Sequence, residues 1–221
     1  MKLMIATPAY DGKVYANYAL SLVSTTDLLK QNNISCDVVI NLSGTLLTAE
    51  RNNIINQFII SDCTHILCVD ADLGWNHQDV LDMLTYDLDF VGGVYPSRQA
   101  EIFIFRPYLN DDGSLINKNG LFSMEYVPAG FMLLKKEAIQ KMIDKFPETR
   151  FEPKDEKLKN ACGWALFNTE VYDGEFWGED YVFCRRAREA GIDIWINPLF
   201  EFIHGSVKGK LIDALSQRDK I

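Results

Sequence analysis

Residues 65–75 read His-Ile-Leu-Cys-Val-Asp-Ala-Asp-Leu-Gly-Trp, and this stretch decides the fold that the sequence predicts. The apolar run at residues 66–69 is typical of a strand buried on both faces. Asp70 and Asp72 follow it directly. Because side chains two positions apart in an extended chain point to the same side, both carboxylates can converge on one object past the strand's end. A divalent cation suits two acids that would otherwise repel each other, so the stretch predicts a metal site there.

The Asp-x-Asp pattern alone is weak evidence, because the chain contains nineteen aspartates and repeats the pattern at Asp87-Leu88-Asp89. This second pair follows a predicted helix and precedes a predicted strand, where acids in a solvated turn are ordinary. Asp70 and Asp72 differ because they follow a continuous apolar run. On these residues alone, both a metal site and a polar turn remain open for the first pair.

The composition limits the class of protein. The chain has 221 residues, 48% of them hydrophobic, and a net charge of −9, which allows one sizeable core and no broad positive surface. We therefore expect neither nucleic acid nor an anionic membrane as a partner. Five cysteines without C-x-x-C spacing favour reduced core thiols over disulfides or a zinc site. The first apolar run is too short for a signal peptide and no stretch is long enough for an integral membrane segment, so we expect a cytoplasmic protein.

The first half of the chain alternates strand and helix. Short apolar runs predict strands at residues 2–6, 36–40, 66–69 and 90–95, and apolar residues with helical spacing lie between them at 15–29, 54–59 and 80–84. Asn76 is the expected cap of the third helix. This order predicts an α/β fold with an open, mostly parallel sheet and helices on both faces, in which ligands bind beyond the carboxyl ends of the strands. Residues 7–10, 41–43 and 70–72 should share that rim.

The pattern changes after Pro96. Short strands are predicted near residues 101–106, 114–116, 121–127 and 131–134, separated by turn signals, which suggests a smaller antiparallel portion appended to the parallel one. A helix is expected at 136–146 and a mobile loop at 147–169. Another helix is expected at 181–190, followed by strands at 193–196 and 200–203. Residues 207–221 are polar enough to form a tail.

Two further features carry candidate chemistry. Glu179 and Asp180 begin the helix at 181–190, where acids stabilise the helix dipole by about 0.3–1 kcal/mol each and need no other role. His204 follows the last predicted strand, and a lone histidine is more often structural than a ligand. Taken singly, neither feature identifies a site.

Several motifs occur in a fixed order along the chain. They are Thr7-Pro8-Ala9-Tyr10, Arg51-Asn52, Val69-Asp70-Ala71-Asp72, Val127-Pro128-Ala129-Gly130-Phe131, Gly178-Glu179-Asp180 and His204-x-Ser206. Together they resemble the motifs of nucleotide-sugar-dependent glycosyltransferases of the GT-A type, over about residues 1–206. Similar single-domain enzymes occur among glycan-building proteins of bacteria and of large DNA viruses. The resemblance implies one domain at 1–206, with a nucleotide-binding half at 1–98 and an acceptor and metal half at 99–206.

The resemblance also implies a metal centre. Asp70 and Asp72 resemble the acids that hold Mn²⁺ or Mg²⁺ against the donor's diphosphate, with Asp70 nearer the ribose and Asp72 the firmer ligand. His204 corresponds to a third metal ligand in many members of the family. A metal ion there would stabilise the negative charge that grows on the leaving diphosphate.

Other residues match positions that contact the donor or the acceptor. They are Thr7, Ala9, Tyr10, Arg51 and Ala71 for the nucleotide, and Gly130 for close approach of the backbone to a sugar. Asp180 or Glu179 resembles the base that removes a proton from the acceptor hydroxyl in inverting members. Neither need be a base if the enzyme retains configuration.

The sequence therefore predicts a metal-dependent transfer of a sugar from a nucleoside diphosphate donor to a hydroxyl of a glycan acceptor. A UDP-sugar is favoured over a GDP-sugar. One alternative is a non-catalytic protein of the same fold that binds nucleotides or glycans. A sugar-nucleotide pyrophosphorylase is less favoured, because the opening loop has only Gly12 instead of a glycine-rich run.

Overall fold

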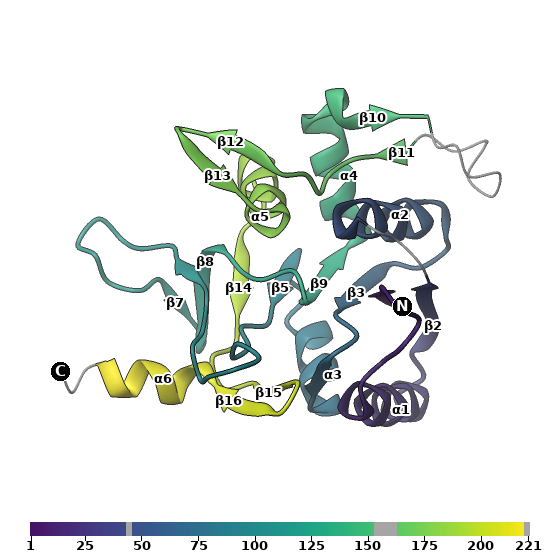
Figure 1. Ribbon diagram of the computed structural model, residues 1–221, viewed down its shortest axis with the longest axis horizontal. Helices are drawn as coiled ribbons and strands as arrows, with labels where there is room; N and C mark the ends of the chain where they lie inside the picture. The colour runs from purple at the N-terminus through teal and green to yellow at the C-terminus, as the bar shows by residue number, and fades with distance from the viewer. Residues whose placement is uncertain (43–45, 153–162, 219–221) are drawn as a thin grey trace.

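The computed structural model describes residues 1–42, 46–152 and 163–218 (Figure 1). Its helices are α1 (Ala16–Gln31), α2 (Leu47–Ile60), α3 (His77–Thr85), α4 (Lys136–Lys145), the 3₁₀ turn η1 (Pro147–Thr149), α5 (Glu179–Glu189) and α6 (Leu211–Arg218). The central sheet has, in spatial order, β2 (Ser35–Leu42), β1 (Lys2–Ala9), β3 (His65–Val69), β9 (Phe131–Lys135), β5 (Phe90–Gly92), β14 (Ile194–Ile196), β8 (Leu121–Tyr126) and β6 (Arg106–Pro107), with β7 (Asn117–Lys118) beside β8. Smaller sheets pair β10 (Arg150–Phe151) with β11 (Gly163–Trp164), β12 (Glu170–Tyr172) with β13 (Glu175–Trp177), and β15 (Glu201–His204) with both β4 (Leu73–Trp75) and β16 (Val207–Lys210).

The central sheet confirms the expected mostly parallel α/β fold. Strand β1 runs parallel to β2 and β3, and β5 runs parallel to β14. The expected antiparallel portion is present at one end of the sheet, where β8 pairs antiparallel with β14, β6 and β7. Strand β9 was also expected there, but it lies between β3 and β5 and pairs antiparallel with both. Residues 131–134 are buried, so β9 is a central strand. Its register sets Phe131 opposite Val69, which brings the residues before β9 to the end of β3.

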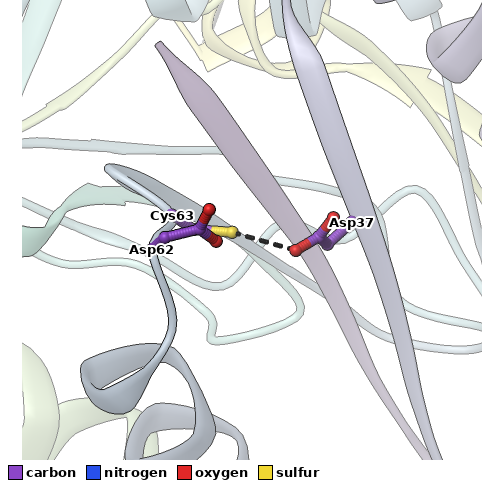
Figure 2. Close-up of side chains that lie close together, drawn as sticks. All are labelled: Asp37, Asp62 and Cys63. Atoms are coloured by element: carbon purple, nitrogen blue, oxygen red, sulfur yellow. Dashed lines mark hydrogen bonds between the residues drawn. The ribbon is translucent and has the colours of Figure 1, made fainter.

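The amino ends of the strands carry a charged cluster (Figure 2). Nζ of Lys2 at the start of β1 lies 2.7 Å from Asp37 of β2 and 2.6 Å from Asp62, which precedes β3. The thiol of Cys63 donates to Asp37 over 3.5 Å. Because the strands are parallel, this cluster lies at the edge of the sheet opposite to the one that carries Asp70 and Asp72.

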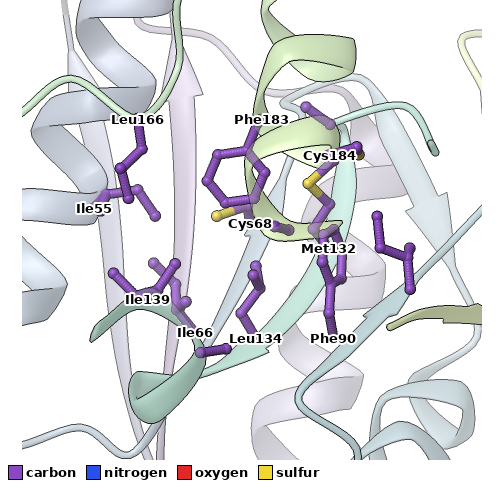
Figure 3. Close-up of a cluster of buried hydrophobic side chains, with 14 of the residues drawn as sticks. Ile55, Ile66, Cys68, Phe90, Met132, Leu134, Ile139, Leu166, Phe183 and Cys184 are labelled. Atoms are coloured by element: carbon purple, nitrogen blue, oxygen red, sulfur yellow. The ribbon is translucent and has the colours of Figure 1, made fainter. Parts of the chain in front are cut away.

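Two layers of helices cover the sheet. Figures 1 and 3 show α2, α4 and α5 against one face, where residues such as Ile55, Ile139 and Phe183 pack on Ile66 and Leu134. On the other face, α1 and α3 pack on the alternate side chains of the same strands. The described cysteines have free thiols, and three of them are buried, as expected. Cys162 lies outside the described residues.

The end of the described chain is more regular than expected. Residues 207–218, taken from the sequence as part of a polar tail, form β16 and α6, and Leu211 is buried. The polar pattern arises because β16 is an edge strand whose Lys208 pairs with Glu201 at 2.7 Å. The region expected as a mobile loop contains η1, β10 and β11, and its part at 153–162 lies outside the described residues. Within the described ranges, no helix has the length and apolar character needed to cross a membrane.

Helix α3 begins after Asn76 as expected, since the Asn76 side chain accepts a hydrogen bond from the Gln78 amide. Asp79 in its first turn is buried, and its Oδ2 atom has no hydrogen-bond partner among the described residues. Burial, with the nearby charge of Asp82, raises the pKa of Asp79 to about 7. The folded protein therefore holds a proton on this carboxyl that the unfolded chain releases at a lower pH.

This pKa shift predicts a pH-dependent effect of Asp79→Asn. As the pH rises from about 4 to about 7, the unfolded chain loses the proton first, so the wild-type protein loses stability. The uncharged variant should not lose stability in this way. Above pH 7 its free energy of unfolding should exceed that of wild type by on the order of 2–4 kcal/mol, and below pH 4 the two should be equal. Urea unfolding across this pH range would measure the difference. Asp144→Asn on the exposed face of α4 serves as the control, and equal curves for Asp79→Asn and wild type would contradict the assignment.

Candidate functional site

The turn formed by Asp70, Ala71 and Asp72 is held by main-chain hydrogen bonds from three separate parts of the chain. The amide of Asp70 donates to Gly130 O (2.9 Å), the amide of Tyr15 donates to Ala71 O (2.9 Å), and the amide of Gly205 donates to Asp72 O (3.1 Å). These partners precede β9, cap α1 and follow β15. These hydrogen bonds fix the backbone of the turn and do not involve the two carboxylates.

The Asp70 carboxylate is paired with a buried cation. Nη2 of Arg51 on α2 lies 2.9 Å from its Oδ1, and Nη1 donates to Ala129 O at 3.1 Å. Nε of the same guanidinium lies 3.6 Å from Glu179 and makes no hydrogen bond within the part of the chain that the structure describes. Burial opposes the charge of Arg51, but Asp70 and other neighbours outweigh this effect and raise its pKa. Arg51 therefore ties α2, β3 and α5 together, and it is only 4% exposed, so the groups that it contacts in this structure are the protein's own.

The Asp72 carboxylate faces a different pair of groups. Its Oδ2 lies 2.6 Å from Nε of Arg98 and 3.2 Å from Nε2 of His204. Burial raises the pKa of Asp72, but His204 and Arg98 outweigh it and the net shift is downward. Nδ1 of His204 lies 2.8 Å from Pro96 O, to which it donates. This bond fixes the tautomer of the neutral ring in which Nε2 carries a lone pair on the side of Asp72.

A cavity of about 740 Å³ opens in front of the turn, a size suited to a small organic ligand. Asp70, Ala71 and Asp72 line it. The other lining residues come from the end of β1 and the loop after it, from the start of α2 and from the segment after β5: Pro8, Tyr10, Asp11, Lys13, Val14, Tyr15, Leu47, Glu50 and Arg98. Tyr10 and Tyr15 each expose more than half of their surface.

Two residues expected at this cavity lie behind it. Thr7 is fully buried, and its hydroxyl lies 2.6 Å from that of Tyr18 on α1. Ala9 is also buried. Side chains alternate along β1, so Pro8 and Tyr10 face the cavity while Thr7 and Ala9 face the core.

A second cavity of about 440 Å³ lies beside the first. It is lined by Tyr95, Asp180, Tyr181 and His204, and by Arg98, which also lines the first cavity. Burial and the charge of Glu179 raise the pKa of Asp180, so this carboxylate is a stronger base than an exposed one. One oxygen, Oδ1, accepts from the Tyr181 amide. Of the two candidate bases, Asp180 therefore faces a cavity, whereas Glu179 faces Arg51.

The surroundings of Gly130 leave no room for a side chain. A Cβ atom built there would lie 2.6 Å from Oδ2 of Asp70 and 2.8 Å from Cζ of Tyr95, both of which are too close. The Gly130 amide donates to the Tyr95 hydroxyl over 3.1 Å. The missing side chain thus makes room for Asp70 and Tyr95, and the approach of a ligand to Gly130 stays a prediction. Tyr95 was not identified from the sequence as a site residue.

The donor atoms near Asp72 fit a divalent metal. Carboxylate oxygen and imidazole nitrogen both suit Mn²⁺, and the second nitrogen of His204 is held by a backbone carbonyl, as in many metal sites. Asp70, turned toward Arg51, does not join Asp72 and His204 in a tight group. Within the described ranges, the three candidate ligands whose atoms all lie within 4.8 Å are Asp37, Asp62 and Cys63. Lys2 already pairs with both carboxylates of that cluster.

The second Asp-x-Asp pair behaves as a solvated turn. Asp87 has a positive φ of 54° and pairs with Lys135, and Asp89 pairs with Lys141 at 2.6 Å. Neither acid lines the two cavities described above. The same three-residue pattern therefore has two different environments in one chain.

The buried position of Arg51 predicts a large effect of Arg51→Gln. The substitution leaves Asp70 and Glu179 without their shared cation in a site of low dielectric constant, and we expect a loss of about 3–5 kcal/mol in the free energy of unfolding. Chemical denaturation would measure this loss. Lys141→Gln removes an exposed cation that is also paired with an aspartate, and should cost about 1 kcal/mol or less. Equal losses in the two variants would show that Arg51 does not hold the site together.

No model of a protein family matches the sequence, and no curated protein does. Several solved structures have a fold similar to that of this chain. GalNAc-T7 with UDP, GalNAc and Mn²⁺ has a TM-score of 0.53 at 10% identity, over 93% of this chain and 45% of that chain. A mutant of Drosophila β1,4-galactosyltransferase 7 with manganese, UDP-Gal and xylobiose has a TM-score of 0.48 at 16% identity, over 89% of this chain and 64% of that chain. S. aureus TarS with UDP has a TM-score of 0.46 at 14% identity, over 89% and 57%.

The chain therefore spans less than two thirds of the length of each of these three proteins. At such low identity the likeness concerns the fold. The mostly parallel sheet with an inserted antiparallel strand gives this chain the GT-A fold, which it shares with GalNAc-T7.

Proposed function

We propose that this protein is a metal-dependent glycosyltransferase that moves a sugar from a nucleoside diphosphate, UDP in particular, to a hydroxyl of a glycan acceptor. One observation carries the proposal. The turn with Asp70 and Asp72 borders a cavity of nucleotide size, Asp180 and His204 border a second cavity, and Arg98 lines both. A group-transfer reaction needs such an arrangement, because donor and acceptor must meet at a shared boundary.

The first cavity is the proposed donor site. Tyr10 and Tyr15 offer exposed aromatic rings to a base, and the carboxylates lie at the inner end. Asp72 and His204 would hold the metal, with Asp70 at its side. Bound there, Mn²⁺ or Mg²⁺ would supply positive charge to the leaving diphosphate. UDP is favoured over GDP by analogy of fold, since GalNAc-T7 holds UDP and Mn²⁺.

The second cavity is the proposed acceptor site. Asp180 would accept the proton of the attacking hydroxyl on Oδ2, because Oδ1 already accepts from the Tyr181 amide. Its raised pKa suits it to this role. Glu179 would act indirectly, since it faces Arg51 instead of the cavity. This assignment corresponds to an inverting reaction.

The alternative function is a non-catalytic protein that binds nucleotides or glycans with the same fold. Release of UDP from UDP-sugars in the presence of Mn²⁺, measured with and without a panel of glycan acceptors, separates the two. Release that depends on acceptor supports the transferase. Tight UDP binding without release across a broad panel would favour the binding protein.

The metal assignment predicts that Asp72→Asn abolishes the part of UDP binding that depends on Mn²⁺. The variant loses the charged ligand that faces His204, so UDP and Mn²⁺ together should no longer raise its melting temperature beyond UDP alone. Asp89→Asn, from the second Asp-x-Asp pair, is the matched control and should respond like wild type. A normal response of Asp72→Asn to UDP with Mn²⁺ would remove the metal from this site.

The base assignment predicts a different result for Asp180→Asn. The amide keeps the shape of the side chain and the bond from the Tyr181 amide but cannot take a proton, so transfer should fall by about 100-fold or more while UDP affinity stays within about threefold. Asp173→Asn, an exposed acid in the turn before β13 with a positive φ that Asn tolerates, is the control. Parallel loss of UDP binding and transfer would instead give Asp180 a structural role.

A further inference from the structure

Arg98 occupies an unusual position for an exposed side chain. Its side chain is 67% exposed, yet Nε lies 2.6 Å from Oδ2 of Asp72, which is only 7% exposed. The same Nε donates to Nε2 of His204 over 3.2 Å. One N–H group therefore lies where a carboxylate oxygen and an imidazole nitrogen direct their lone pairs.

These two acceptor atoms are the ones that we assign to the metal. Nδ1 of His204 is occupied by Pro96 O, so Nε2 is the nitrogen that remains to accept or to coordinate. A divalent cation and the Arg98 N–H group would use the same lone pairs of Asp72 and His204. They cannot do so at the same time.

We propose that Arg98 is a built-in counter-ion that competes with the divalent metal for Asp72 and His204, and that, once displaced, it binds the phosphates of the donor. This inference rests on the proposed function, because it takes Asp72 as a metal ligand. It adds a role for a residue in the donor site that no sequence motif marked.

The local backbone supports a movement of the side chain alone. Arg98 lies in a tight turn after β5, in which the Ser97 amide donates to Ile102 O (2.8 Å) and the Ser97 hydroxyl donates to Ala100 O (2.9 Å). The turn is thus closed by its own hydrogen bonds. The long Arg98 side chain already lines both cavities, so rotation about its own bonds can move the guanidinium from Asp72 toward either.

The charge of the donor cavity gives the displaced side chain a partner. Its lining has two cationic residues, Lys13 and Arg98, and Nζ of Lys13 lies 3.0 Å from Asp11. In a chain with a net charge of −9, a diphosphate in this cavity needs a cation besides the metal. A guanidinium matches phosphate oxygens in bidentate geometry.

Mn²⁺ binding without nucleotide tests the competition directly. We expect Arg98→Gln to bind Mn²⁺ about tenfold more tightly than wild type in calorimetric titrations, because the metal no longer displaces a charge-assisted hydrogen bond. Arg98→Lys keeps a cation and should stay within about threefold of wild type. Lys141→Gln loses an equal charge from a pair of the same 2.6 Å length and should bind like wild type. Equal or weaker Mn²⁺ binding by Arg98→Gln would overturn the inference.

The second measurement is the affinity for UDP at saturating Mn²⁺. Here Arg98→Gln should bind UDP about tenfold more weakly, since the phosphates lose a guanidinium. Tighter Mn²⁺ binding with unchanged UDP affinity would overturn the role of Arg98 toward the phosphates. Asp72→Asn separates this inference from the proposed function. If that variant binds Mn²⁺ like wild type, the metal site itself is wrong; if it loses Mn²⁺ while Arg98→Gln equals wild type, only the role of Arg98 is wrong.

Discussion

Repulsion between carboxylates is the constraint on which this structure depends. The fold brings Asp70, Asp72, Glu179 and Asp180 toward one edge of the sheet in a chain of net charge −9. Arg51 reduces the repulsion between Asp70 and Glu179, because its guanidinium is buried between them. The remaining acids then differ in environment. Asp72 contacts the exposed Arg98 and the titratable His204, and the pKa of Asp180 is raised. Such a division suits the roles that we propose for Asp72 toward a metal and for Asp180 toward a proton.

Two other acidic pairs in the same chain show how much the surroundings matter. Asp37 and Asp62 share Lys2 at the opposite edge of the sheet, and Asp87 and Asp89 each pair with a surface lysine. Neither pair borders the two cavities. The acids after β3 differ because the carboxyl end of a central strand opens onto a cavity, and because a neighbouring strand and two loops hold their backbone in place.

Local patterns were sufficient for most of the fold. The apolar run before Asp70, the helical spacing that became α1 and the Asn76 cap were all readable, because each depends on neighbours within a few residues. The position of β9 was not readable, since its pairing with β3 joins residues more than sixty positions apart. The same limit applies to residue roles. Thr7 needed the side-chain parity of β1 to be placed in the core, and Arg51 needed the position of Glu179. Tyr95 was expected only as the last residue of a strand that in fact ends at Gly92, and Arg98 belongs to an irregular stretch that carries no periodic signal.

Our central proposal is that the turn after β3, and no other acidic group among the described residues, holds a metal against a nucleoside diphosphate. A crystal structure of the protein with UDP and Mn²⁺, with manganese located by anomalous scattering, tests it most directly. We expect one strong manganese peak bound by Asp72 and His204, with the UDP phosphates beside it and the base near Tyr10. Manganese at Asp37 and Asp62, or UDP outside the cavity in front of Asp70, would contradict the account.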